Sequence, residues 1–188
     1  KGDYFAAGDV DGKVYLFQNN KAVSKLWHYS SDYPFLSVDI SANGDYIVAG
    51  SEDNKVYLFN KNESAPIWTY TANDDVYRVA ISSDSQYIVA STLDASVYVF
   101  HRDNSEPLWS YSTEGLKVFV AISDDGEYIV AGGLDYKVYL FNKDSSTPLW
   151  NYTVDDLDND GRFSVAISQN GDYLVVAAEK LYLFGKSN

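Results

Sequence analysis

Four tryptophans divide this chain at a constant interval. They are Trp27, Trp68, Trp109 and Trp150, and each lies 41 residues after the one before it. Around them runs a repeated segment, which is clearest as VAISDDGEYIVAGGLDYKVYLFNKDSSTPLWNY at residues 120–152. Near-copies occur from end to end, so the chain is one supersecondary unit repeated.

A second marker fixes the kind of unit. A turn of the type GDY recurs, and its tyrosine stands at Tyr4, Tyr46, Tyr87, Tyr128 and Tyr173, with intervals of 42, 41, 41 and 45 residues. Repeats of about 40 residues that contain only strand-like segments are typical of β-propeller blades. Helical repeats of that length would show a 3.6-residue apolar period instead.

Four strands are expected in each unit, here named a to d. In the clearest copy they are residues 120–123 (strand a), 128–132 (strand b), 138–141 (strand c) and a segment around Trp150 (strand d). β-branched and aromatic residues dominate these runs, and Gly, Asn, Asp, Ser and Pro fill the gaps. Strands b and c are apolar at nearly every position, so we expect both of their faces to be covered by neighbouring blades.

The strand count sets the expected domain organisation. Residues 1–35 supply strands b, c and d, residues 36–77, 78–118 and 119–163 are complete units, and residues 164–188 supply a, b and c. Both terminal pieces carry their own b and c, so they cannot merge into one blade by strand exchange. We therefore expect an all-β propeller segment with five visible blade positions, part of a larger propeller. The alternative is a native five-blade protein with two defective blades.

Composition excludes several classes of partner. Asp and Glu total 27 against 14 Lys and Arg, which gives a net charge of −13. Because phosphate binding needs clustered cations, we expect neither nucleic acid nor an anionic membrane surface as partner. The chain has no cysteine, so disulfides and thiolate metal sites are excluded. Its apolar runs are far shorter than the ~20 residues of a membrane helix, and we expect no membrane insertion by this segment.

Two known repeat types resemble this one, and the resemblance covers the whole chain. The stretch VAISDDGEYIVAGGLDYKVYLF resembles the tryptophan-aspartate (WD) repeat, with Phe141 where that family usually has Trp. The stretch VYLFNKDSSTPLWNY, closed by Trp150, resembles the blade motif of pyrroloquinoline-quinone-type propellers. Such hybrid repeats are similar to those of exported or surface-exposed archaeal and bacterial proteins.

The resemblance implies a toroidal propeller whose central funnel or one face binds partners, in an extracellular or cell-surface location. It does not imply the quinone cofactor, and none is expected. The paired cysteines of many quinone alcohol dehydrogenases are absent, and this repeat type is common in proteins that are not enzymes.

Strand order predicts which loops share a face. In an antiparallel unit the d-to-a and b-to-c loops lie on the same side, and these loops differ most between repeats. They are residues 31–35, 72–77, 113–118 and 154–163 for d-to-a, and 9–12, 52–54, 93–96 and 134–136 for b-to-c. Because variable loops on a rigid scaffold usually carry binding sites, we expect any site on this face.

The four-residue excess in the last d-to-a loop suggests a metal site. Asp156, Asp158 and Asp160, followed by Gly161, give the pattern D-x-D-x-D-G. Alternate carboxylates at a tight glycine turn supply the hard oxygen ligands that Ca²⁺ prefers. The loop resembles the calcium loops of integrin-type propellers and dockerin-like modules, although the later EF-hand ligands are missing. The alternative is an acidic, solvated loop.

Three further residues depart from the repeat on strand a, which lines the channel of a propeller. Asp39 stands where the other units have alanine, and Arg78 and Phe119 stand where two units have serine. They are candidates for a ligand site in the funnel; the alternative is drift among decaying repeats. Asn62 (NES) and Asn151 (NYT) fit the glycosylation sequon, which matters only if the chain is exported.

Catalysis finds little support in the sequence. No glycine-rich phosphate loop, nucleophile elbow or histidine-based nucleophile arrangement can be assembled. The leading hypothesis is a non-catalytic binding or scaffold module of a larger exported or cell-surface protein, which presents its variable loops to protein or glycan. The alternatives are a quinoprotein-like oxidoreductase or lyase with a funnel active site, and a structural spacer in a surface layer or filament. Closure of the propeller would come from the covalent remainder of a longer chain or from self-association.

Overall fold

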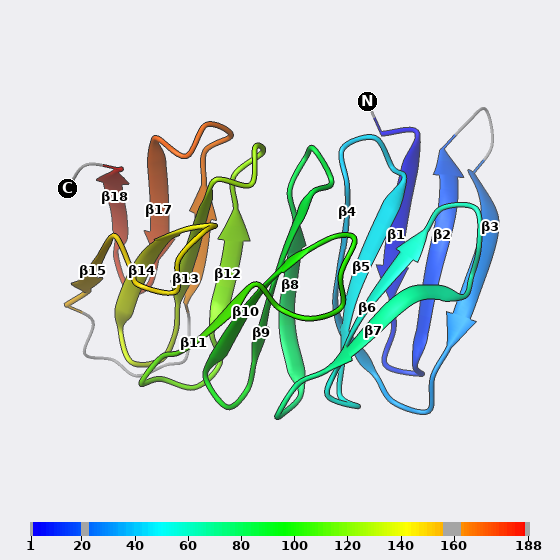
Figure 1. Ribbon diagram of the computed structural model, residues 1–188, viewed down its shortest axis with the longest axis horizontal. Helices are drawn as coiled ribbons and strands as arrows, with labels where there is room; N and C mark the ends of the chain where they lie inside the picture. The colour runs from blue at the N-terminus through cyan, green and yellow to red at the C-terminus, as the bar shows by residue number, and fades with distance from the viewer. Residues whose placement is uncertain (1, 20–22, 156–162, 187–188) are drawn as a thin grey trace.

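The computed structural model describes residues 2–19, 23–155 and 163–186. Within these residues it contains eighteen strands in five antiparallel sheets, and no helix that is long and apolar enough to cross a membrane. The expected all-β architecture is confirmed. Figure 1 shows the sheets following one another in chain order along the longest axis, with the first sheet and the last sheet at opposite ends.

The sheets have three or four strands each. The first sheet holds β1 (Tyr4–Gly8), β2 (Lys13–Asn19) and β3 (Val23–Ser30). The second holds β4 (Phe35–Ile40), β5 (Tyr46–Ser51), β6 (Lys55–Asn60) and β7 (Pro66–Thr71). The third holds β8 (Val76–Ile81), β9 (Tyr87–Thr92), β10 (Ser96–His101) and β11 (Trp109–Ser112). The fourth holds β12 (Phe119–Ile122), β13 (Tyr128–Gly132), β14 (Lys137–Asn142) and β15 (Trp150–Thr153), and the last holds β16 (Ser164–Ile167), β17 (Tyr173–Ala177) and β18 (Leu181–Gly185).

The hydrophobic core lies between neighbouring sheets. In one of its four clusters Val14 and Leu16 of β2 pack against Ile47 of β5 and Phe59 of β6. Strands β5, β6, β9, β10, β13 and β14 are buried along almost their whole length. The prediction that strands b and c are covered on both faces is therefore confirmed for the three central sheets.

Two of the innermost strands begin earlier than the sequence predicts. Strands β4 and β8 start at Phe35 and Val76, within the segments expected to be loops. In both strands the pairing register shifts after the first residue, as in a β-bulge. The bulge lets the strand extend while Phe35 and Val76 stay buried, and it breaks the two-residue alternation that would have revealed the extra residues.

The same hydrogen bond joins every pair of neighbouring sheets. The indole N–H of each tryptophan donates to a backbone carbonyl that follows the third strand of the next unit, at 2.8, 2.7, 2.7 and 3.2 Å in chain order. The acceptors are the carbonyls of Lys61, Arg102, Lys143 and Lys186. The tryptophan ring also packs on the phenylalanine of that third strand, with centroids 5.3 to 5.6 Å apart. Each unit is thus held by its successor.

The side chains of those four cationic residues complete the junction. Each lies over the tyrosine that opens strand b of the preceding unit (β1, β5, β9 and β13), with the cation 5.5, 4.7, 5.7 and 4.3 Å from the ring centroid. The tyrosines are Tyr4, Tyr46, Tyr87 and Tyr128. Cation–π contacts of this kind add to the packing of the rings. The recurring tyrosine of the sequence is therefore part of the inter-unit contact.

Candidate functional site

A cleft opens between two loops that belong to different units. One of them connects β3 to β4 and the other connects β5 to β6. Two adjoining hollows, each of about 320 Å³, share Tyr33, Asp53 and Lys55. The remaining lining residues are Tyr29, Ser30, Ser31, Asp32, Glu52, Asn54 and Tyr57. We call this the loop cleft; it lies among the d-to-a and b-to-c loops, where variability between repeats predicts a binding site.

Asp53 is the fixed charge of the loop cleft. Its carboxylate accepts hydrogen bonds from the Tyr57 hydroxyl at 2.5 Å and from the Lys55 backbone N–H and ammonium, both at 3.1 Å. Burial acts to raise the pKa of Asp53, but the bonds from Tyr57 and Lys55 outweigh it and the pKa lies below its usual value. Burial and the neighbouring Asp53 charge raise the pKa of Tyr57. Asp53 is therefore anionic and Tyr57 neutral near neutral pH.

The exposed groups of the loop cleft are an aromatic ring and further carboxylates. Tyr33 is 53% exposed, although it is a large side chain, and Asp32 beside it is also exposed. The negative potential extends to the next unit. Burial raises the pKa of Asp75, and the charges of Asp74, Glu52 and Asp53 raise it further. Such a surface favours cationic groups and disfavours anions.

The structure separates the residues predicted for the funnel. Asp39 lies on β4, where its carboxylate accepts the backbone N–H of Ile40 at 2.8 Å and that of Ile81, on β8 of the next sheet, at 2.9 Å. The Ser37 hydroxyl accepts the N–H of Val79 in the same way, at 3.2 Å. Asp39 thus joins the innermost strands of two sheets, and burial raises its pKa.

Arg78 and Phe119 do come together, with a third residue that the sequence did not single out. The Arg78 guanidinium carbon lies 4.0 Å from the ring centroid of Tyr77 and 5.1 Å from that of Phe119. The guanidinium donates to the Tyr77 carbonyl at 2.9 Å and to its hydroxyl at 3.3 Å. Among the described residues it forms no ion pair with a carboxylate, so aromatic rings hold it in place.

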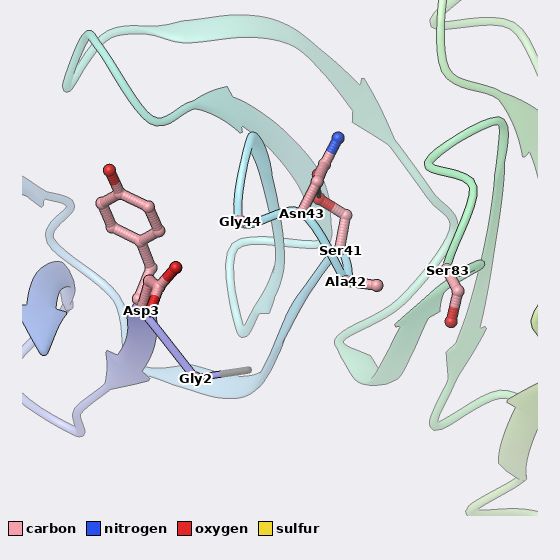
Figure 2. Close-up of a pocket in the computed structure, with 8 residues that line it drawn as sticks. Gly2, Asp3, Ser41, Ala42, Asn43, Gly44 and Ser83 are labelled. Carbon is pink, nitrogen blue, oxygen red and sulfur yellow. Dashed lines mark hydrogen bonds between the residues drawn. The ribbon is translucent and has the colours of Figure 1, made fainter.

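A larger pocket lies on the opposite face, among the turns that join the first and second strands of each unit. It has a volume of about 550 Å³ and is lined by Gly2, Asp3, Tyr4, Ser83 and the turn at residues 41–44. Figure 2 shows this turn opposite Gly2 and Asp3, with Ser83 of the next unit to one side. The Ser41 hydroxyl is bonded to Asn43 at 2.7 Å, and the Asn43 amide to Asp45 at 2.9 Å. The polar side chains of the turn are therefore already engaged with one another.

The remaining predicted residues are placed as follows. Asn62 is exposed in the turn after β6, and Asn151 is exposed on β15. Asp156, Asp158 and Asp160 lie outside the described residues. Within the residues that are described, no group of three or more His, Asp or Glu side chains is arranged to hold a metal ion.

The lining of these pockets does not fit a pyrroloquinoline quinone. That molecule is a flat tricarboxylate and needs cationic partners when it is buried. Lys55 is the one cationic residue lining the loop cleft, where it is paired with Asp53, and none lines the pocket of Figure 2.

Comparison with known proteins agrees with the repeat structure. No curated protein matches the chain. A family profile described as outer membrane protein assembly factor BamB, of the pyrroloquinoline-quinone repeat type, matches residues 10–188. The family includes both quinoprotein enzymes and scaffolds without enzymatic activity. The chain belongs to this family, and its five sheets are blades of a β-propeller built from pyrroloquinoline-quinone-type repeats.

Proposed function

We propose that this chain is a non-catalytic binding module, and that its loop cleft holds lysine- or arginine-bearing segments of a partner protein. The observation that carries the proposal is that the half-exposed Tyr33 lines the same hollow as the carboxylates of Asp32 and Asp53, on the most variable face of the molecule. An aromatic face beside fixed carboxylates attracts cationic side chains by cation–π and ionic contacts together.

Electrostatics over the whole chain support the same class of partner. The net charge is −13, and acidic residues of two neighbouring loops reinforce one another around Asp75. A field of one sign accelerates association with partners of opposite charge and suppresses association with like-charged ones. Binding is therefore expected to weaken as ionic strength rises.

The family supports the location and the kind of partner. Its description names an outer membrane protein assembly factor. Such a factor acts on other proteins, outside the cytoplasm. We therefore place this module in an exported protein, in the periplasm or at the cell surface, with a protein as its partner.

A titration with defined peptides tests the proposal. A labelled peptide of alternating lysine and serine is expected to bind, and its counterpart with glutamate in place of lysine is not. Tyr33→Ala should weaken binding by roughly twofold to tenfold, because a cation–π contact at a partly exposed site contributes about 0.5–1.5 kcal/mol. Asp32→Asn should weaken it by a smaller factor. The measurement is fluorescence anisotropy at low and at moderate salt.

Matched controls separate the cleft from general charge. Glu63→Gln removes an exposed carboxylate from a turn after β6, and Ile67→Ala truncates an exposed side chain on β7; both should bind as the unchanged protein does. Equal affinity in all four variants, or preference for the glutamate peptide, would show that the loop cleft is not the site.

A further inference from the structure

At one junction, side chains of an innermost strand accept backbone N–H groups of the next innermost strand. Between the second and third sheets, the Ser37 hydroxyl accepts the N–H of Val79 at 3.2 Å, and the Asp39 carboxylate accepts that of Ile81 at 2.9 Å. Both acceptors lie on β4 and both donors lie on β8. The second sheet thus supplies an oxygen atom to each of two N–H groups on the inner edge of the third.

The next junction has different residues at the two acceptor positions. Arg78 stands one period of 41 residues after Ser37, and Ala80 stands one period after Asp39; both lie on β8. Neither an arginine nor an alanine side chain has a hydrogen-bond acceptor. Between the third and fourth sheets, a guanidinium and a methyl group therefore take the places of a hydroxyl and a carboxylate.

The backbone donors of the fourth sheet have the same direction as those of the third. Val120 and Ile122 of β12 stand 41 residues after Val79 and Ile81, and β12 pairs with β13 in the register in which β8 pairs with β9. In an antiparallel pair, the N–H groups of successive residues point to opposite sides of the strand. The N–H groups of Val120 and Ile122 therefore point away from β13, along the inner edge of the sheet, and β12 lies against β8.

The Arg78 guanidinium is fixed at this junction and keeps donors to spare. Its central carbon lies 4.0 Å from the ring centroid of Tyr77 and 5.1 Å from that of Phe119, and two of its N–H groups donate to Tyr77. Three of its five N–H groups remain. In the part of the chain that the structure describes, no carboxylate forms an ion pair with it. Because the side chain is already ordered, binding of an anion costs little conformational entropy.

We propose that this place, the inner-edge site, binds the carboxylate group of a ligand, with the Arg78 guanidinium and an N–H of Val120 or Ile122 as donors. The ligand carboxylate takes the part that the Asp39 carboxylate plays one junction earlier. A planar carboxylate matches the fork of a guanidinium. A group with one negative charge is favoured over a phosphate dianion, because the net charge of the chain is −13. The source is a small organic acid or the free carboxyl end of a peptide, and the site is distinct from the cation-binding loop cleft.

Titration with benzoate, followed by the nuclear magnetic resonance signals of arginine Nε–H groups and backbone amides, tests the proposal. The signals of Arg78, Val120 and Ile122 are expected to shift saturably with benzoate and to stay in place with benzamide, which has a similar shape and no charge. Arg78→Gln should weaken binding about tenfold or more, because charge-assisted hydrogen bonds are lost. Lys180→Gln removes an exposed cation before β18 and should bind as the unchanged chain does.

A substitution that supplies the carboxylate from within the chain tests the same site in another way. Ala80→Asp repeats the arrangement of Asp39, and its side chain lies two residues from Arg78 on the same side of β8. It should abolish benzoate binding. Ala166→Asp places a carboxylate at the same repeat position on β16, away from Arg78, and should leave binding unchanged.

A second pair of probes distinguishes the two sources of the carboxylate. They are an acetylated glycine–serine peptide with a free carboxyl end and the same peptide with an amidated end. Tighter binding of the free-ended peptide than of benzoate would identify a chain end, and the reverse order a small organic acid. The proposal would be overturned if neither carboxylate probe moved the Arg78 signal, if benzamide or inorganic phosphate bound as well as benzoate, or if Arg78→Gln with native circular dichroism kept full affinity.

Discussion

Asp39 shows how one residue that departs from the repeat can carry a contact of its own. The other units have alanine at this position, and an alanine side chain cannot accept a hydrogen bond. Here the two carboxylate oxygens accept N–H groups from two neighbouring innermost strands, at 2.8 and 2.9 Å. This departure was visible in the sequence as a candidate funnel ligand. Its hydrogen bond to the next sheet was not, because nothing in a single repeat specifies the distance to its neighbour.

The pKa of Asp39 predicts a particular pH dependence of stability. Burial raises this pKa above the ordinary value of 3.8. The folded state therefore prefers the protonated carboxyl, and the stability that this preference contributes is lost as pH rises through the folded-state pKa. In Asp39→Asn the group no longer titrates. The free energy of unfolding of the unchanged protein, relative to Asp39→Asn, is expected to fall as pH rises from the ordinary value of 3.8 through the raised pKa of the folded state.

Urea unfolding at several pH values measures this difference. Ile67→Ala, which truncates an exposed side chain on β7 and removes no titratable group, serves as the control and should show no such trend relative to the unchanged protein. A difference that stays flat, or that grows with pH in favour of the unchanged protein, would mean that the Asp39 carboxyl is not destabilised by burial in the folded state.

At the scale of strands and loops, the repeat predicted most of what is seen. The residues VYLF and YIVAG specify the two central strands of each sheet because apolar side chains on both faces fit only a strand covered on both sides. The bulged starts of β4 and β8 were missed, since a bulge places one extra residue outside the alternating pattern. The sequence predicted the face of the molecule on which the loop cleft lies. The residues of the cleft were not predicted, because Tyr33 and Asp53 meet only when two units pack together.

A calcium site in the loop at residues 155–163 remains a prediction. The sequence places Asp156, Asp158 and Asp160 before Gly161, which is the spacing at which Ca²⁺ loops have carboxylate ligands ahead of a tight glycine turn. If the ion binds only the folded chain, calcium at about 100 times its dissociation constant adds about 2.7 kcal/mol to the free energy of unfolding. After removal of metal by a chelator, calorimetric titration measures the heat of calcium binding, and melting curves measure the gain in stability.

Substitutions in the loop test whether calcium binds there. Asp158→Asn and Asp160→Asn should abolish the heat of binding and the rise in melting temperature. Asp124→Asn, in a turn of the fourth sheet, should leave both unchanged. An unaltered melting temperature in saturating calcium would identify the loop as a solvated acidic segment.

Taken as a whole, the molecule is a linear series in which each sheet is held by its neighbours in the chain. The three central sheets are covered on both sides, and the first and last on one side. The sequence predicted the number of sheets and their order from its constant period. It could not predict the bulges or the side-chain bonds between particular sheets, because the repeat describes only what successive units share.

Opening of the array should therefore begin at its ends. In dilute solution the amides of β1, β2, β17 and β18 are expected to exchange with solvent sooner than those of β9 and β10, which lose protection only on unfolding of the central sheet. Hydrogen exchange followed by mass spectrometry of peptides measures this order. Uniform exchange across all five sheets would indicate that the array unfolds as one cooperative unit.

The bond from each tryptophan to the carbonyl of the following unit also bears on how such a chain can change in length. The donor and its acceptor lie 34 residues apart in the first three junctions, within a period of 41. A duplication or deletion of one whole period, wherever its breakpoints fall, therefore leaves each remaining junction with its tryptophan–carbonyl hydrogen bond and its tyrosine–cation contact. Gain or loss of a blade by recombination within the coding sequence disrupts no junction, so natural variants of this array should differ from one another by complete units.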